Sequence, residues 1–176
     1  MVKGKGAKQR GSVFERKVRD ELKRIYPADR RKAVGRIPMS GAGSIKGDIL
    51  DQNDTDFCYE CKKHERLSIP AWWRQTLAQT QSWQMPVLVF SSSYQPIYWV
   101  MRESDFSYCV GVAGMKDIVE PYGTGTKREL YKALANNRPV YGYYPVEIDG
   151  ESLVIVHNDY YIPIRRAIWT NQHGNR

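Results

Sequence analysis

The stretch DFCYECKKHE, residues 56–65, alternates apolar and polar side chains and also holds two cysteines and a histidine. This alternation predicts a β-strand over residues 57–62, because successive side chains of a strand point to opposite faces. One face then carries Cys58, Glu60 and Lys62, and the other carries Phe57, Tyr59 and Cys61. We expect the apolar face to pack on a helix, whereas the acid and the lysine of the first face can both reach one phosphate.

The spacing of Cys58, Cys61 and His64 allows two other interpretations, a zinc site and a thiol redox pair. A structural zinc site needs four ligands, and the remaining cysteine, Cys109, is distant in the sequence. A strand over residues 57–62 would also direct the thiols of Cys58 and Cys61 to opposite faces. A reactive thiol pair, in contrast, normally lies at the start of a helix. A third interpretation is an exposed ion pair between the acid and the lysine of the strand, which those two residues alone would favour.

Asp48 is a second carboxylate that bears on the function of this stretch. It opens a short predicted strand, residues 48–50, which a turn-like segment separates from residues 57–62. If the two strands form a hairpin, Asp48 comes close to Glu60. Converging carboxylates repel each other unless a divalent cation lies between them, and oxygen ligands suit Mg²⁺ or Mn²⁺. Lys62 beside such a metal could stabilise charge on a phosphodiester or orient the attacking water.

The positive charge of the chain is concentrated at its N-terminal end. The formal net charge is +8, yet the first 36 residues carry +9 and the other 140 residues carry −1. A basic block of this kind attracts polyanions, because binding releases their counterions. Contact with nucleic acid is therefore favoured over a solubilising tail.

Length and composition indicate a soluble, cytoplasmic protein with one domain, or one domain with an extension. The chain has 176 residues, 41% of them hydrophobic, and no apolar run long enough to span a bilayer. The basic start has no apolar stretch after it and so does not resemble a signal peptide. Three cysteines are an odd number without the spacing of a disulfide framework, which suits a reducing compartment. We expect no membrane partner and no nucleotide cofactor.

Local patterns in the first hundred residues predict an α/β fold. A basic flexible arm, residues 1–11, precedes a helix that begins at the capping box Ser12–Glu15 and ends before Pro27. A second helix is expected from Ser68 to about Trp83. Strands are predicted at residues 33–38, 48–50, 57–62, 87–90 and 97–101. The order is therefore helix, three strands, helix, two strands.

The last third of the chain has a different pattern, which predicts an α+β extension. Thr126–Glu129 is a second capping box, so a helix should begin there. Asp149-Gly150 is a strong signal for a hairpin turn between strands at residues 140–148 and 151–156. Residues 160–169 are expected to add a strand or a docked tail.

The set Gly47-Asp48 … Glu60-Cys61-Lys62 resembles the signature of PD-(D/E)xK nucleases, with Gly47 where that motif often has proline. Further motifs resemble archaeal-type Holliday junction resolvases, including a phage version of them. They are Lys5-Gly-x-Lys8-x-Arg10-Gly11, Glu15-Arg16, Arg36-x-Pro38-x-Ser40-Gly41, and a helix with Gln75 followed by residues 87–90. The resemblance covers residues 3 to about 101. It implies a restriction-endonuclease-like core, a mixed β-sheet flanked by helices in αβββαβ order, at residues 12–101 between the arm 1–11 and the extension 102–176.

The resemblance also implies roles for individual residues. Asp48, Glu60 and the backbone carbonyl of Cys61 would bind Mg²⁺, or Mn²⁺ in its place, and Lys62 would face the scissile phosphate. Glu15 would reach the metal directly or through water, although as the N3 acid of a capping box it could equally be a helix cap. Ser40 would take part in catalysis, with Ser44 as a rival in the same loop, and Gln75 would contact DNA, with Gln79 as its rival. Phosphate contacts are expected from Lys3, Lys5, Lys8 and Arg10, and also from Arg36 and Lys46.

The patterns and the resemblance together imply a Mg²⁺-dependent, structure-selective DNA endonuclease. The favoured activity is that of a Holliday junction resolvase, which makes paired nicks in four-way DNA junctions. Because a four-way junction has two-fold symmetry, such an enzyme is expected to be a homodimer. Two alternatives remain open: a repair, restriction or replication nuclease that uses the same site on other DNA, and a non-catalytic DNA-binding scaffold.

Overall fold

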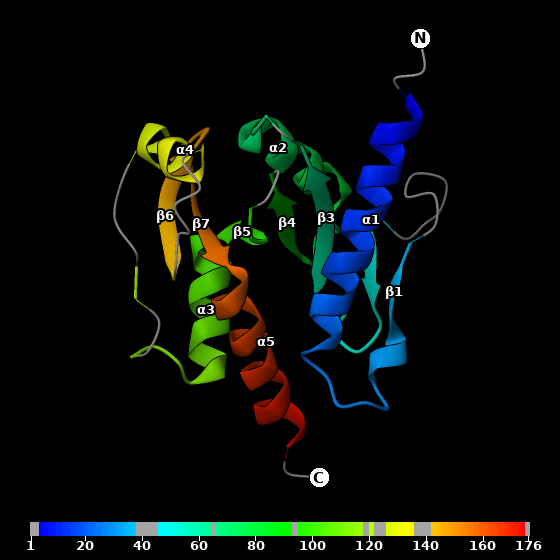
Figure 1. Ribbon diagram of the computed structural model, residues 1–176. Coiled ribbons are helices and arrows are strands. Elements are labelled where there is room, and N and C mark those ends of the chain that lie inside the picture. The colour runs from blue at the N-terminus through cyan, green and yellow to red at the C-terminus, as the bar shows by residue number, and fades with distance from the viewer. Residues whose placement is uncertain are drawn as a thin grey trace.

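The computed structural model describes residues 4–37, 46–64, 66–92, 95–117, 120–121, 126–135 and 142–174, with side chains from residue 9 onward except those of residues 127 and 135. A seven-stranded mixed sheet forms the centre of the molecule, in the order β1-β2-β3-β4-β5-β7-β6. Helices cover both faces of this sheet (Figure 1). The predicted α/β class with a restriction-endonuclease-like core is thereby confirmed.

The first helix, α1 (Gly4–Lys23), begins well before the predicted start at Ser12. The predicted capping box is wrong, because Ser-x-x-Glu also fits inside a helix and the preceding Ala, Lys, Gln and Arg are good helix formers. Residues 4–11 therefore continue α1 and do not form a separate arm. Glu15 lies in the middle of α1, which removes the helix-capping interpretation of its carboxylate.

Three short strands follow α1 and make one edge of the sheet. They are β1 (Val34–Arg36), β2 (Ile49–Asp51) and β3 (Phe57–Lys63). Each pairs antiparallel with the next, so β2 and β3 form the predicted hairpin. Helix α2 (Ile69–Gln79) then crosses over to β4 (Met85–Ser91), which pairs parallel with β3. The predicted helix extended to about Trp83, but the backbone is already extended at Thr80.

The C-terminal segment enlarges the same sheet. Strand β5 (Tyr98–Arg102) leads into α3 (Glu103–Ala113), a helix that the sequence patterns did not indicate. The capping box before α4 (Lys127–Ala135) is confirmed, since the amide of Thr126 donates to Glu129 Oε2 at 2.8 Å. The predicted hairpin is also confirmed as β6 (Tyr143–Ile148) and β7 (Glu151–His157). Strand β7 pairs antiparallel with β5, so both hairpin strands belong to the central sheet.

The chain ends in α5 (Asn158–His173), where a strand or a docked tail was predicted. The strand is wrong, whereas the segment does dock on the core, as a helix against α3, β5 and β7. The β-branched and aromatic residues of this segment and its internal proline, Pro163, suggested extended structure. Yet Tyr161, Ile164, Arg165 and Ile168 are all buried, and they recur at the three- and four-residue spacing of one helix face.

The sheet separates two apolar cores. Helices α1, α3 and α5 cover one face, where Val18, Tyr59 and Trp99 are buried in a shared cluster. Helices α2 and α4 cover the other face with a second cluster that includes Trp73 and Leu134. No helix among the described residues combines the length and hydrophobicity needed to cross a membrane.

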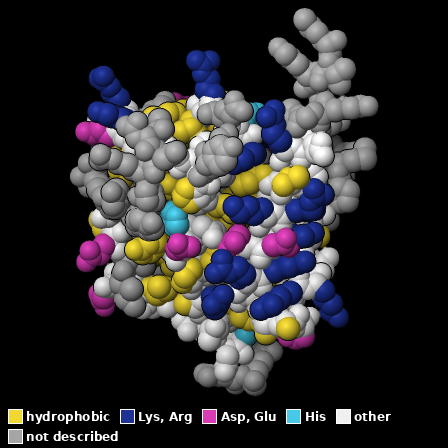
Figure 2. Space-filling view, in the orientation of Figure 1, with side chains coloured by type: hydrophobic (Ala, Val, Ile, Leu, Met, Phe, Trp, Pro, Cys, Tyr) yellow, Lys and Arg dark blue, Asp and Glu magenta, His cyan; other side chains and the backbone are white. Residues whose placement is uncertain are grey.

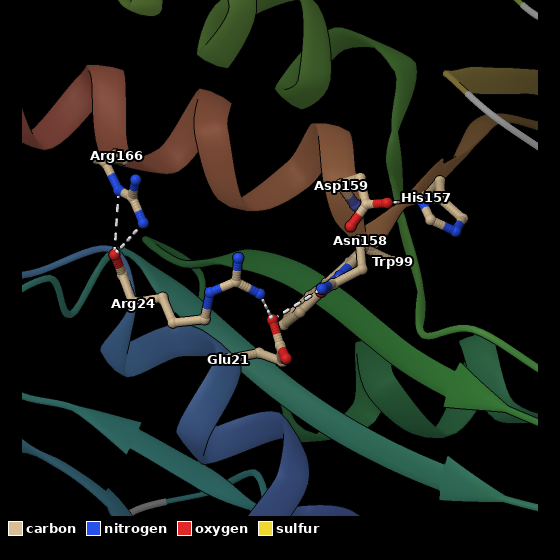
Figure 3. Close-up of polar contacts among 7 residues, drawn as sticks. All are labelled: Glu21, Arg24, Trp99, His157, Asn158, Asp159 and Arg166. Atoms are coloured by element: carbon tan, nitrogen blue, oxygen red, sulfur yellow. Dashed lines mark hydrogen bonds and ion pairs between the residues drawn. The ribbon is translucent and has the colours of Figure 1, made fainter.

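Polar contacts tie α5 to α1 at the front of the molecule. Figure 3 shows Asn158 between two partners: it accepts from Trp99 Nε1 at 3.0 Å and donates to Glu21 Oε2 at 2.8 Å. Two nitrogens of Arg166 also donate to the backbone carbonyl of Arg24, at 3.0 and 2.6 Å. The C-terminal helix is therefore held against the helix that begins the chain.

Candidate active site

The β2–β3 hairpin brings Asp48 beside Glu60. The Asp48 amide donates to the carbonyl of Tyr59 at 2.8 Å, and Ile49 pairs with Tyr59 across the hairpin. In return, the backbone amide of Cys61 donates to Asp48 Oδ2 at 2.7 Å. The backbone therefore fixes the position of the Asp48 carboxylate next to the strand that carries Glu60.

Glu60 is a buried carboxylate, with only 2% of its surface exposed. Its Oε1 accepts two hydrogen bonds, from Lys62 Nζ at 2.6 Å and from Gln75 Nε2 at 3.0 Å. Its Oε2 is buried without a hydrogen-bond partner among the described residues. Burial raises the pKa of Glu60, the charge of Asp48 raises it further, and the Lys62 ammonium opposes both effects. A buried carboxylate oxygen that lacks a partner is a position where a bound cation would be favourable.

Gly47 explains why this chain departs from the proline often found before the motif aspartate. Its backbone φ is +93°. Proline cannot adopt this angle because its ring fixes φ at about −65°, and any residue with a Cβ atom adopts it only at an energetic cost. A Cβ atom at this position would lie 2.9 Å from the carbonyl oxygen of Tyr59. The Gly47 amide also donates to Gln79 Oε1 at 3.1 Å, a bond that proline could not make.

Both candidate glutamines of α2 contact the motif. They are four residues apart and so lie on the same face of the helix. Gln75 donates to Glu60, whereas Gln79 accepts from Gly47, directly before Asp48. The sequence indicated Gln75 and Gln79 as rivals for one role, and the structure gives each its own contact. The four-residue spacing of Gln75 and Gln79 in the sequence could have indicated that both side chains reach the site.

Glu15 comes from α1 and is paired with Arg36 of β1. Arg36 Nε donates to Glu15 Oε2 at 2.8 Å, and Arg36 Nη2 bonds to the same oxygen. The Glu15 charge also contributes to raising the pKa of Glu60, so the two acids share one electrostatic environment. Within the described residues, however, no three His, Cys, Asp or Glu side chains gather closely enough to hold a metal ion. The two acids at the motif are therefore Asp48 and Glu60, whereas Glu15 forms an ion pair with Arg36.

The cysteines of the opening stretch lie on opposite faces of β3, as the strand alternation predicts. Cys58 Sγ lies 3.9 Å from the carbonyl oxygen of Gln79 in α2, whereas Cys61 packs against the core under α1. His64 stacks on Trp72 with ring centroids 5.4 Å apart. Burial raises the pKa of both thiols and so disfavours the thiolate that metal binding or redox chemistry needs. The structure gives no support to a zinc or redox site here.

The remaining predicted site residues are placed only in part. Ser40, its rival Ser44 and Lys3 lie outside the described residues, as do the side chains of Lys5 and Lys8. Arg10 is exposed on α1, and Lys46 is exposed directly before Gly47. Lys and Arg side chains gather over α1 and the adjoining edge of the sheet, on the right of Figure 2. The surface over α1 is thus rich in positive charge.

A mixed sheet whose β2–β3 hairpin presents Asp48 opposite Glu60-x-Lys62, with helices on both faces, defines a PD-(D/E)xK nuclease fold. The chain belongs to the family described as "Phage putative PDDEXK endonuclease", whose model matches residues 6–122. The match includes α1, the hairpin, α2 and α3, and it ends before β6, β7 and α5. Neither the curated proteins nor the solved structures gave a match to this chain.

Proposed function

We propose that this protein is a Mg²⁺-dependent endonuclease that hydrolyses DNA phosphodiester bonds at Asp48, Glu60 and Lys62. The buried Glu60 Oε2, without a hydrogen-bond partner in the described structure and next to a second carboxylate, is the observation that carries the proposal. Two carboxylates in this position are unfavourable without a cation. The endonuclease family to which the chain belongs supports the same activity.

The donor set suits a hard divalent cation. Asp48 and Glu60 offer carboxylate oxygens, and the backbone carbonyl of Cys61 is a further candidate ligand. Mg²⁺ and Mn²⁺ prefer such oxygen ligands and keep several waters, so a complete side-chain cage is not required. When bound, the metal supplies an activated water and neutralises charge on the phosphate. Glu15 is proposed to reach this metal directly or through water, in exchange for its bond to Arg36.

Lys62 is proposed to act on the scissile phosphate. Its ammonium is held 2.6 Å from Glu60 Oε1 on the same face of β3, so its position is defined by the acid that would bind the metal. From there it can stabilise negative charge that develops on the phosphate oxygens, or orient the attacking water. Gln75 donates to the same Glu60 oxygen, and it orients that carboxylate whether or not it also contacts DNA.

DNA contacts are proposed on the basic face around α1. Lys3, Lys5, Lys8 and Arg10 would bind phosphates, together with Lys46 beside the motif and Arg36 once Glu15 is engaged elsewhere. These contacts depend on charge and shape and carry no sequence information. Ser40 is proposed to contribute from the loop that precedes Lys46.

The favoured substrate is a four-way DNA junction, cut by a homodimer that presents two such sites. The motifs around Lys5, Arg36 and Ser40 support this choice. The second candidate is an endonuclease that acts on other DNA. It is favoured by the family description, which names an endonuclease without a junction substrate, and by strands β6 and β7, which lie outside the family match.

Cleavage of labelled DNA tests both candidates. A four-way junction, a fork and a linear duplex are incubated with the parent protein and with Asp48→Asn, in Mg²⁺ and in EDTA. Paired nicks on the junction alone, lost with EDTA and in the variant, are expected for a resolvase. Equal cutting of all three substrates would keep the nuclease and reject the resolvase. Folded protein that cuts none of them in Mg²⁺ or Mn²⁺ would overturn the proposed activity and leave a DNA-binding scaffold.

A further inference from the structure

A basic pocket of about 500 Å³ lies where α1 and α5 end, and we call it the α1–α5 pocket. Its lining comes from residues 24–27 after α1, from Arg31, and from the second half of α5. Three arginines line it, Arg24, Arg31 and Arg166, together with His173 and no acid. None of the lining residues belongs to β2, β3 or α2, which carry the candidate active site. The pocket is therefore a separate place on the molecule.

Backbone carbonyls hold two of these arginines next to each other. Arg166 donates through Nε and Nη2 to the carbonyl oxygen of Arg24, at 3.0 and 2.6 Å (Figure 3). Arg31 donates through Nε to the carbonyl oxygen of Tyr26 at 3.1 Å. Residues 24 and 26 are two positions apart, which limits their separation to about 7 Å along the chain. One phosphate, or two neighbouring phosphates of one strand, can therefore contact both guanidinium groups.

The charges of Arg31 and Arg166 are not neutralised by acids of the protein. Arg24 forms an ion pair with Glu21 at 2.5 Å, whereas neither Arg31 nor Arg166 has an acid at ion-pair distance among the described residues. A guanidinium also has more N–H groups than these carbonyls accept. The C-terminal ends of α1 and α5 contribute about −0.5 charge each, which offsets about one of the two guanidinium charges. The pocket thus keeps both positive charge and hydrogen-bond donors for a ligand.

The chain segment around the pocket concentrates positive charge. Residues 23–32, KRIYPADRRK, hold five Lys or Arg and a single acid, Asp29. The carboxylate of Asp29 pairs with Arg30 at 3.7 Å and leaves Arg31 and Lys32 without an acid. Figure 2 shows Lys and Arg side chains gathered over the region where α1 and α5 end. A basic surface of this kind attracts polyanions such as nucleic acid.

The side chains of the pocket suit a phosphate group better than a base or a lipid chain. Guanidinium groups match the geometry of phosphate oxygens and bind them through paired hydrogen bonds. The indole of Trp169 is already covered, because His173 stacks on it with centroids 3.7 Å apart and Tyr26 contacts it in a T-shaped arrangement at 4.9 Å. None of the large hydrophobic side chains that the described structure exposes lines the pocket, so nothing here would insert into a membrane.

We infer that the α1–α5 pocket is a second DNA-binding site, in which Arg31 and Arg166 hold phosphates of the DNA backbone. The inference rests on the proposed function for its ligand, DNA, but not on cleavage. A branched substrate has several duplex arms, so one arm can occupy this pocket while another lies at Asp48 and Glu60. Phosphate contacts of this kind position the DNA and do not read its sequence.

Binding measured without cleavage tests the inference. The Asp48→Asn protein is titrated, in EDTA and at several salt concentrations, into a labelled four-way junction, with and without the added pair Arg31→Gln/Arg166→Gln. Loss of two phosphate contacts should make the slope of log affinity against log salt concentration shallower by about 2 and lower the affinity on the order of 10-fold. Arg128→Gln/Lys132→Gln is the control, since it removes two exposed charges from α4 on the opposite face of the sheet. The control should leave slope and affinity nearly unchanged.

A second variant keeps the contact between α5 and α1 intact, in case the loss of Arg166 unfolds the protein. Arg31→Glu reverses an exposed charge without removing the bonds from Arg166 to the Arg24 carbonyl, and it should also weaken junction binding. Circular dichroism verifies that each variant is folded. Equal slopes and affinities with and without the pocket substitutions would overturn the inference, as would losses that the α4 control reproduces.

Other ligands with the same phosphate chemistry are tested on the same proteins, with inorganic phosphate and with phosphatidylserine vesicles. If Arg31→Glu lowers the Tm gain in phosphate, or vesicle binding, but not DNA affinity, the DNA site is overturned. If DNA binds through the pocket but the parent protein cuts none, the nuclease fails and the pocket stands. If the parent protein cuts DNA and the pocket substitutions leave DNA binding unchanged, the nuclease stands and the pocket fails.

Discussion

Gly47 and Gln79 are joined by a hydrogen bond of 3.1 Å from the glycine amide to the glutamine Oε1. The bond connects the residue before Asp48 to α2, the helix that also supplies Gln75 to Glu60. One face of α2 therefore helps to position both carboxylates of the site. Gln79 holds the backbone just before Asp48, and Gln75 bonds to a carboxylate oxygen of Glu60. The hairpin and α2 therefore form a single support for the pair.

Replacing Gly47 by alanine should weaken the site and the fold together. The backbone φ of +93° and the approach of a Cβ to within 2.9 Å of the Tyr59 carbonyl both disfavour a side chain here. We expect the free energy of unfolding, measured by urea denaturation, to fall by about 1–2 kcal/mol, with a larger fractional loss of cleavage. Gly35→Ala is the control, because a Cβ at Gly35 meets no atom within 4 Å. Equal stability of the two variants would contradict this account of Gly47.

Gln75→Leu should reduce metal-dependent cleavage without unfolding the protein. Gln75 is exposed on α2, and its amide donates to Glu60 Oε1, so the substitution removes one of the two groups that orient this carboxylate. Loss of such an orienting partner typically lowers metal affinity or activity about 10- to 100-fold. Cleavage rates measured across a Mg²⁺ titration should show a higher Mg²⁺ requirement. A variant with the parent's Mg²⁺ dependence would mean that Lys62 alone orients Glu60.

Asp48→Asn should stabilise the metal-free protein. The asparagine can still accept the hydrogen bond from the Cys61 amide, but it removes the charge that opposes ionisation of buried Glu60. We expect the free energy of unfolding in EDTA to rise by about 1 kcal/mol, the order of the Coulomb repulsion between two unit charges about 4 Å apart in water. Mg²⁺ should then raise the Tm of the parent chain and leave that of the variant almost unchanged. A destabilised variant in EDTA would show that Asp48 is held by favourable contacts that outweigh its repulsion.

Arg165 links the C-terminal helix to the hairpin, and its loss should be costly. The side chain is 1% exposed, Nη2 donates to Asp54 Oδ2 at 2.8 Å, and the guanidinium lies 3.7 Å from the centre of the Phe57 ring. Arg165→Met leaves the Asp54 charge without this partner, so urea denaturation should give a loss of about 3–5 kcal/mol. The double variant Arg165→Met/Asp54→Asn should recover part of the loss. No recovery would attribute the effect to packing against Phe57.

His157 should make stability depend on pH below neutrality. It is buried before α5, its Nδ1 accepts from the Asp159 amide at 3.1 Å, and burial lowers its pKa below the ordinary 6.5, with Asp159 opposing the shift. The unfolded chain therefore binds a proton first as the pH falls. Stability is complete above about pH 6.5 and declines below it, by at most about 1.4 kcal/mol per pH unit. His157→Asn retains a helix-capping side chain but does not titrate, so a pH series of urea denaturations should show a shallower decline for this variant.

Several features of the protein followed from short-range sequence patterns. Strict alternation placed Glu60 and Lys62 on one face of a strand, the turn-like segment before it predicted the hairpin, and Thr126 and Glu129 predicted a helix start. Asp149-Gly150 predicted the turn between β6 and β7 because both residues adopt positive φ there. Each of these features depends on residues within a few positions of one another, which is why the sequence alone was sufficient.

Contacts between distant segments required the tertiary structure. The pairing of Glu15 with Arg36, the separate roles of Gln75 and Gln79, and the bond from Arg165 to Asp54 join elements that the chain keeps far apart. The strand considered for residues 160–169 is a helix instead, because burial against α3, β5 and β7 outweighs the weak helix propensity of its aromatic and β-branched residues. The sequence could thus identify the acids of the site, but only the packing of α1, α2 and α5 around the hairpin decided which side chains hold them in place.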